Sequence, residues 1–213
     1  MEFPKAFKMS DPFTGLFDLA IETYDKLTQQ VETESPPEDV FACKAGCEHC
    51  CYQQPISVTP IEVFHIANHV RETFSDTEFS ALMARFDRPI PSIEFGGLTA
   101  CPFLVDHNCS IHANRPFACR SANSYNAEEC RRAARNGFKG KTISTYQGHY
   151  TATQYVLDAL YKAIRDSQLE NGLFNFRSAV AIALKDKAVE KKWRRGQEVF
   201  GAESVAGYTD RNH

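Results

Sequence analysis

The run CKAGCEHCC, residues 43–51, places four of the chain's eight cysteines, Cys43, Cys47, Cys50 and Cys51, within nine residues. Thiolates at two- and three-residue spacings can converge on one soft cation such as zinc or iron. The neighbours Cys50 and Cys51 are poorly placed for a disulfide with each other, because that bond needs two facing Cβ vectors. With Gly46 inside it, the run predicts a turn-rich metal knuckle.

A second set of thiols begins at Cys101, 50 positions after Cys51. A closed zinc site or an iron–sulfur cluster needs about four sulfur ligands. The two segments contain more cysteines than that number, so the sequence is compatible with one metal and spare thiols or with two metals. A metal held by both segments would close a long loop and stabilise the fold. The expected metal ligands are Cys43, Cys47, Cys50, Cys51, Cys101, Cys109 and Cys119.

Other potential ligands have simpler interpretations. Cys130 lies in a predicted helix beside two arginines, where a packed or mildly activated thiol is expected. A mixed cysteine and histidine site is an alternative, because three histidines lie inside the cysteine segments: His49, His107 and His112. His65 and His69 are four positions apart on a predicted helix and could also hold a metal, but helical histidines at this spacing are commonly surface residues.

Two arginines flank Cys119 and can donate hydrogen bonds to sulfur. We expect this role for Arg115 and, above all, for Arg120. The basic stretch from Arg115 to Lys141 and the run KKWRR are interpreted as solvated helix faces that also offset an anionic thiolate cluster. Because the whole chain carries a formal net charge of −3, we do not expect a nucleic-acid partner.

The cellular setting follows from what the sequence lacks. The N-terminal residues MEFPKAFKMS contain no continuous apolar stretch, and no segment approaches the roughly 20 apolar residues that span a bilayer. We therefore expect a cytoplasmic protein with no membrane association. In a reducing cytosol its cysteines would be thiols or metal ligands, which favours a metal site over a disulfide scaffold.

Apolar residues at three- and four-residue steps predict amphipathic helices from Phe13, after the cap pair Asp11-Pro12, and near residues 151–169 and 177–195, the last with Ala188 among its buried residues. Two capping boxes, Thr59 to Glu62 and Ser75 to Glu78, predict two further helices, and a short one begins at Asn126. The run CPFLVDHNCSIH predicts two short strands joined at Asp106 to Asn108. The expected fold is therefore mainly α: a single domain, 1–213, with a short β-hairpin, a central cysteine-cluster region at 41–120 and a flexible tail at 197–213.

The cysteine segments also resemble a known family. CKAGCEHCC followed by CPFLVDHNCSIHANRPFACR is similar to the CxxCxxCC or YkgJ-type cysteine-cluster family, a zinc- or iron-chelating domain to which the flagellin lysine N-methylases are related. The resemblance covers residues 41–120 and rests on Cys50-Cys51, the CPFL run from Cys101, the stretch from Cys109 to His112 and the run from Arg115 to Arg120. Three residues separate Cys43 from Cys47, where the family name has two. The resemblance implies a bacterial cytoplasmic metal-binding protein.

Three functions are compatible with these observations. The first is a metal-binding protein that holds zinc or iron, including a [4Fe-4S] cluster, through both segments. The second is an iron–sulfur protein-modifying enzyme resembling flagellin lysine N-methylase, and the third is a thiol-redox or metal-handling protein. The spacing of Cys43, Cys47 and Cys50 matches that of radical S-adenosylmethionine enzymes, but the chain lacks their alternating strands and helices. The sequence therefore assigns no catalytic residue and identifies no protein partner or substrate.

Overall fold

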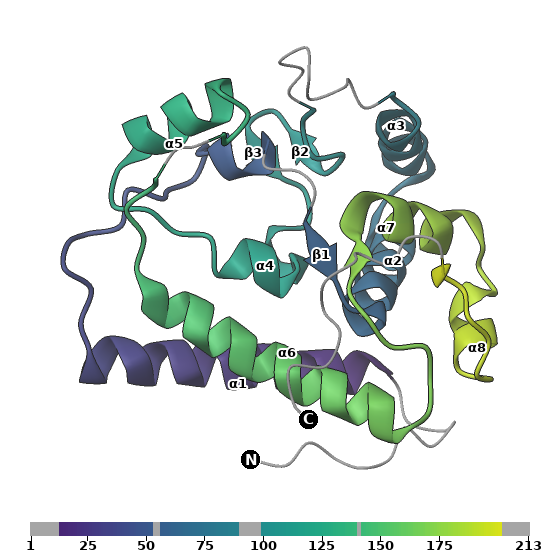
Figure 1. The fold of residues 1–213 in the computed structure, drawn as a ribbon. Coiled ribbons are helices and arrows are strands. Elements are labelled where there is room, and N and C mark those ends of the chain that lie inside the picture. The colour runs from purple at the N-terminus through teal and green to yellow at the C-terminus, as the bar shows by residue number, and fades with distance from the viewer. Residues whose placement is uncertain (1–12, 53–55, 90–98, 140–141, 202–213) are drawn as a thin grey trace.

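The computed structural model describes residues 13–52, 56–89, 99–139 and 142–201. This part of the chain is mainly helical, as the sequence predicts (Figure 1). Its α-helices are α1 (Phe13–Glu34), α2 (Pro60–Thr73), α3 (Asp76–Phe86), α4 (Phe117–Arg120), α5 (Ala127–Arg135), α6 (Gln147–Asp166), α7 (Phe176–Lys185) and α8 (Val189–Trp193), and its 3₁₀ turns include η1 (His49–Tyr52). Within the described residues, no helix is both long and apolar enough to cross a membrane.

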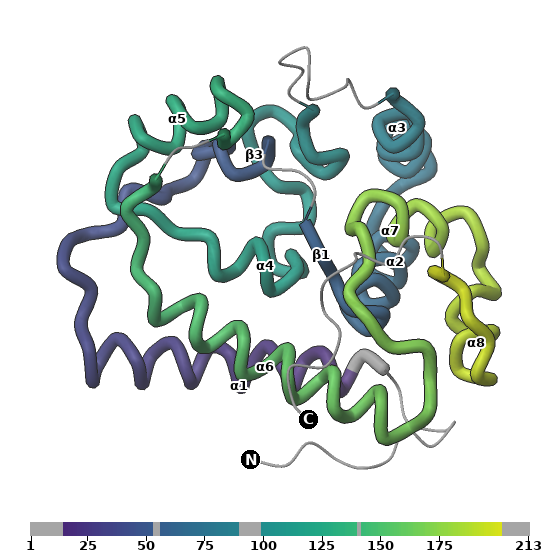
Figure 2. The backbone as a smooth tube through the Cα atoms, in the orientation of Figure 1, coloured from purple at the N-terminus to yellow at the C-terminus, as the bar shows by residue number. Residues whose placement is uncertain are grey.

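The helices form two packed pairs around one core. Helices α1 and α6 lie side by side and run in opposite directions, and α2 packs against α7 (Figure 2). Fully buried aromatic side chains fill the space between them; Phe64, for example, lies between Trp193 and Phe200, with ring centroids 5.3 and 5.5 Å away. Burial of this apolar surface is the main force that holds the helical layers together.

Both predicted capping boxes are confirmed. Thr59 and Ser75 are the N-caps of α2 and α3, and in each case the side chain of the glutamate three positions later accepts a hydrogen bond from the N-cap backbone N–H. This reciprocal pairing satisfies two otherwise unpaired N–H groups and fixes where each helix begins. The Asp11-Pro12 pair expected to start α1 lies outside the described residues.

The C-terminal helices differ from the prediction. The expected helix at 177–195 is two helices, α7 and α8, and Ala188, expected to be buried, is exposed. Asp186 causes the break: its backbone is extended, and its carboxylate accepts the N–H of Ala188 at 2.8 Å and pairs with Lys192. An aspartate that binds its own neighbouring backbone competes with helix continuation. Helix α6 begins at Gln147, four residues before the predicted start.

The described part of the predicted tail, residues 197–201, packs against the body of the protein. The carboxylate of Glu170 accepts hydrogen bonds from the backbone N–H groups of Val199, Phe200 and Gly201 at 2.7 to 2.9 Å. Phe200 is 1% exposed. The core therefore extends to residue 200, and the rest of the predicted tail lies outside the described residues.

Two small antiparallel sheets complete the described fold. The predicted hairpin is confirmed as β2 (Leu104–Val105) paired with β3 (Asn108–Cys109). Its two-residue turn places Asp106 and His107 at φ values of 46° and 64°, the left-handed geometry that suits a tight hairpin. The second sheet, β1 (Ser57–Val58) with β4 (Phe174–Asn175), was not predicted, because its strands are too short to show a periodic pattern.

Candidate metal centre

The two cysteine segments meet in the structure, as the sequence predicts. The backbone N–H of Cys101 donates to the carbonyl of Cys51 at 2.8 Å, and His107 at the hairpin turn pairs with Glu48 at 3.0 Å. On the opposite side, η1 packs beneath α5 (Figure 1). The first cysteine run thus lies between the hairpin and α5.

Local backbone geometry folds the first run into the predicted knuckle. Gly46 has a φ of 80°, which glycine adopts without a steric penalty, and the N–H of Cys47 donates to the carbonyl of Lys44 at 3.0 Å. The N–H of Cys51 then donates to the carbonyl of Glu48 at 2.8 Å and closes η1. These two turns compress the run, so that its thiols point to more than one side.

One set of thiols, the inner thiol group, consists of Cys51, Cys101, Cys109 and Cys119. These four cysteines are half-buried; Cys51 comes from η1, Cys101 from the chain just before β2, Cys109 from β3 and Cys119 from α4. Burial, together with the charges of the neighbouring thiols, raises the pKa of Cys101 to about 12 and that of Cys119 well above its ordinary value. Without a metal these thiols stay protonated, because burial disfavours a thiolate.

A second set, the outer thiol group, consists of Cys43, Cys47, Cys50 and Cys130. Desolvation by the surrounding chain is the main cause of the raised pKa of Cys43 and Cys130, and the charges of Cys47 and Cys50 add to it in both cases. The sequence placed Cys130 apart as a packed helical thiol, whereas the structure brings it to the first cysteine run. Nothing in the spacing reveals this, because the packing of α5 on η1 is a long-range contact.

Cys50 and Cys51 connect the two groups. The S–H of Cys51 donates to the sulfur of Cys50, and this hydrogen bond lowers the pKa of Cys50 to about 6, with a smaller contribution from the charge of Arg115. The same hydrogen bond raises the pKa of Cys51. Cys50 is also a neighbour of the inner thiols, because its charge raises the pKa of Cys101, Cys109 and Cys119. The two groups therefore meet at this pair of adjacent cysteines.

Cys119 is positioned by a carboxylate from α2. Glu62, which closes the α2 capping box, is 1% exposed, and its second carboxylate oxygen accepts the N–H of Phe117 at 2.9 Å. Phe117 is the first residue of α4, the short helix that carries Cys119. Burial raises the pKa of Glu62 above its ordinary value, while the hydrogen bonds that it accepts oppose that rise. One side chain thus caps two helices.

The arginine that faces the thiols is Arg115 rather than Arg120. The charge of Arg115 lowers the pKa of Cys50, Cys109 and Cys119. Arg120 instead donates to the backbone carbonyls of Arg115, at 3.1 Å, and Ala113. Arg120 therefore holds the loop from which Arg115 reaches the thiols, because its own donors are used by the backbone.

The histidines have separate contacts. His65 stacks on Phe17 and bonds Asn114 through Nε2 at 2.7 Å, so this nitrogen already has a partner. The Nε2 of His112 is 2.9 Å from Arg115, whose charge lowers the pKa of His112. His49 lines the same cavity as the outer thiol group.

A cavity of about 1060 Å³ opens beside the outer thiol group. Its wall includes all four outer thiols, the chain between α4 and α5, and one face of α6 with residues such as Tyr150, Gln154 and Tyr161; the four inner thiols do not line it. This volume is in the range of pockets that hold small molecules or side chains. The two groups therefore differ in access to solvent.

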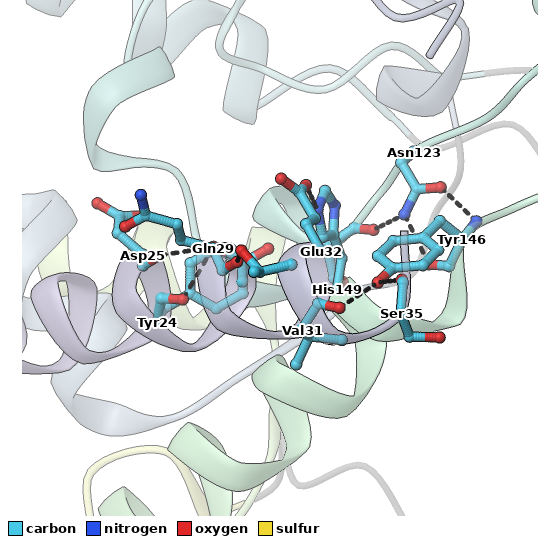
Figure 3. A network of polar contacts seen from close by, with 12 residues as sticks. Tyr24, Asp25, Gln29, Val31, Glu32, Ser35, Asn123, Tyr146 and His149 are labelled. Atoms are coloured by element: carbon cyan, nitrogen blue, oxygen red, sulfur yellow. Dashed lines mark hydrogen bonds and ion pairs between the residues drawn. The ribbon is translucent and has the colours of Figure 1, made fainter. Parts of the chain in front are cut away.

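A polar network fixes the wall of this cavity (Figure 3). Asn123 accepts the N–H of Tyr146 at 2.7 Å and donates to its carbonyl at 3.0 Å. The hydroxyl of Tyr146 reaches the carbonyls of Val31 and Ser35 at the end of α1, and His149 pairs with Glu32 at 2.6 Å. The start of α6 and the chain after α4 are thus tied to α1.

The donor set fits a thiophilic metal. Among the residues that the structure describes, no three histidine, cysteine or carboxylate side chains already stand in metal-binding geometry, so each group is a set of neighbours rather than a formed coordination shell. Eight thiols in two groups are soft ligands suited to zinc or iron. Arg115 adds a further sign, because its Nε is buried and makes no hydrogen bond to the described atoms, as expected of a donor that faces a thiolate.

Comparison with known proteins supports the same chemistry. Residues 42–137 match the family model CxxCxxCC, described as "Putative zinc- or iron-chelating domain". No curated protein and no solved structure matches the chain. The matched segment begins just before Cys43 and ends after α5, so it contains every cysteine of both thiol groups. Residues 42–137 of this chain, somewhat less than half of its length, are therefore similar to a zinc- or iron-chelating domain, and this similarity supports metal binding by the cysteine segments.

Proposed function

We propose that this protein binds zinc or iron through its inner thiol group. The observation that carries the proposal is the contact between the two cysteine segments: the backbone of Cys51 bonds that of Cys101, 50 positions later, and Cys109 and Cys119 follow Cys101 in the second segment. Four thiolates satisfy a tetrahedral zinc or iron ion, and they equally satisfy a [4Fe-4S] cluster. Half-burial of all four and the nearby charge of Arg115 suit a closed site that carries net negative charge.

A second candidate is an iron–sulfur protein-modifying enzyme of the kind that the flagellin lysine N-methylases represent. The cavity of about 1060 Å³ favours it, because the cavity brings a large open space to the edge of the thiol cluster. A side chain of a protein substrate would fit in this volume. The protein-modifying activity of this candidate rests on analogy with the flagellin lysine N-methylases.

Metal analysis of protein purified without oxygen tests both candidates. We expect stoichiometric zinc or iron in the full-length protein, and loss of that metal in Cys101→Ser and Cys119→Ser. A broad visible absorbance with acid-labile sulfide would establish an iron–sulfur cluster, which the second candidate requires, whereas zinc without sulfide would exclude the second candidate. A protein that neither retains nor takes up zinc or iron would refute the proposal.

Arg115→Met should weaken metal binding by about 10- to 100-fold, a typical cost of losing a residue that supports metal ligands from outside the coordination shell. The physical reason is loss of the positive charge beside Cys50, Cys109 and Cys119. Competition with a chelator of known affinity measures the change. Arg135→Met is the matched control, because Arg135 is exposed on α5. Equal affinities in the two variants would contradict a role for Arg115.

A further inference from the structure

We propose that the outer thiol group, Cys43, Cys47, Cys50 and Cys130, is a second metal site, which takes one thiophilic divalent cation such as zinc at the wall of the cavity. This inference rests on the proposed function, because it assigns the inner thiol group to a separate metal. It uses Cys130, which lies 79 positions beyond Cys51 and outside both cysteine-rich runs.

Ser124 lies against two of the four sulfurs. Its backbone N–H donates to the sulfur of Cys43, and its hydroxyl contacts the sulfur of Cys130. Ser124 is itself 1% exposed, and its carbonyl accepts the N–H of Ala42 at 2.8 Å. A single buried residue therefore lies against both thiols, which makes Cys43 and Cys130 neighbours.

The position of Cys130 is fixed as firmly as that of the knuckle. The N–H of Asn126 donates to the hydroxyl of Ser124 at 3.0 Å, and Asn126 then caps α5 by accepting the N–H groups of Glu128 and Glu129. Cys130 follows in the first turns of α5, the helix that packs on η1. Because Asn126 caps α5 and is bonded to the buried Ser124, the helix holds Cys130 in a fixed position, as a metal ligand requires.

The separation into two sites follows from ligand number and access. Zinc is satisfied by four thiolates, and the chain places four in each group. All four outer thiols line the cavity, whereas none of the inner ones does. The outer cation would therefore be reachable from solvent, and it should exchange with a chelator faster than the inner one. An open thiolate site of this kind suits a cation that is delivered or that meets a ligand in the cavity.

Zinc titration of the metal-free, full-length protein tests the inference, with bound zinc counted by equilibrium dialysis and elemental analysis in the absence of iron and sulfide. We expect two zinc ions per chain in the unmodified protein and one in Cys130→Ser. Cys43→Ser, at an exposed position, should also retain one and serves as the second variant should the change in α5 impair folding.

Double variants establish that the sites are distinct. Cys43→Ser with Cys130→Ser should still bind one zinc, because both changes fall in one site, whereas Cys109→Ser with Cys130→Ser should bind none. One zinc in the unmodified protein that survives in Cys130→Ser would overturn the second site and leave the proposed function standing. Two zinc ions in Cys130→Ser would also overturn it. If neither the unmodified protein nor any variant binds zinc, both this inference and a zinc-binding function are overturned.

Discussion

Removal of the metal is expected to undock the first cysteine run from the hairpin while the helical core stays folded. The metal would close a loop of 50 positions between Cys51 and Cys101. By analogy with the cross-link model for disulfides, closing such a loop contributes about 4 kcal/mol. The core should survive, because its buried side chains come mainly from α1, α2, α6 and α7 and lie outside the thiol groups.

Hydrogen exchange measured with and without chelator checks this result at single amides. Two amides report directly on docking: that of Cys101, which donates to Cys51, and that of Ala42, which donates to Ser124. Their exchange should accelerate by up to about a thousandfold, since about 1.4 kcal/mol corresponds to a factor of ten.

The internal controls lie within the same chain. The amide of Ser110 bonds Phe103 inside the hairpin segment, and the amide of Val63 lies in α2. The exchange rates of these two amides should not change when the metal is removed. In the variant Cys101→Ser, the amides of residues 101 and 42 should exchange fast both with and without chelator. Unchanged exchange at Cys101 and Ala42 after complete metal removal would contradict a metal shared between the two segments.

Replacement of Glu62 by alanine should destabilise the protein by about 3 kcal/mol, because it leaves buried backbone N–H groups of Thr59 and Phe117 without their acceptor. Denaturant unfolding followed by circular dichroism measures the loss. The same variant should weaken metal binding, because α4 carries Cys119. An effect on stability with unchanged metal affinity would separate the two roles and show that the cap on α4 does not position the thiol.

Glu78→Ala is the matched control for this substitution. Glu78 closes an identical capping box on α3, but it is exposed and bridges to no second helix. Its loss should therefore cost much less, and it should leave metal affinity unchanged. Similar losses in the two variants would mean that burial and the bond to Phe117 add nothing at Glu62.

The pH dependence of stability gives an independent check on Glu62. Burial raises its pKa in the folded protein above the ordinary value of 4.5. The unfolded chain then loses this proton at lower pH than the folded chain, so the folded state binds more protons between the two pKa values. The contribution of Glu62 to stability is therefore present below pH 4.5 and is lost as the pH rises through the folded pKa. Glu62→Gln should remove this slope.

Much of the local structure was predictable, because its signals span only a few residues. The capping boxes at Thr59 and Ser75 and the turn at Asp106 each satisfy backbone groups within three positions, so the sequence specifies them without the rest of the fold. The break at Asp186 was missed, because the apolar period continues through it and only the bond from its carboxylate to Ala188 ends the helix.

The sequence predicted which residue types form the site, but not how its cysteines are distributed between the two thiol groups. The sequence by itself determined that soft, thiol-based chemistry lies in two segments and that these segments must meet. Only the tertiary structure decided that the two thiol groups meet at Cys50 and Cys51, that Cys130 lies beside the first cysteine run, and that Arg115 rather than Arg120 faces the sulfurs. The physical reason is that these outcomes depend on contacts between distant elements, such as α5 on η1 and Glu62 on Phe117, which no local spacing encodes.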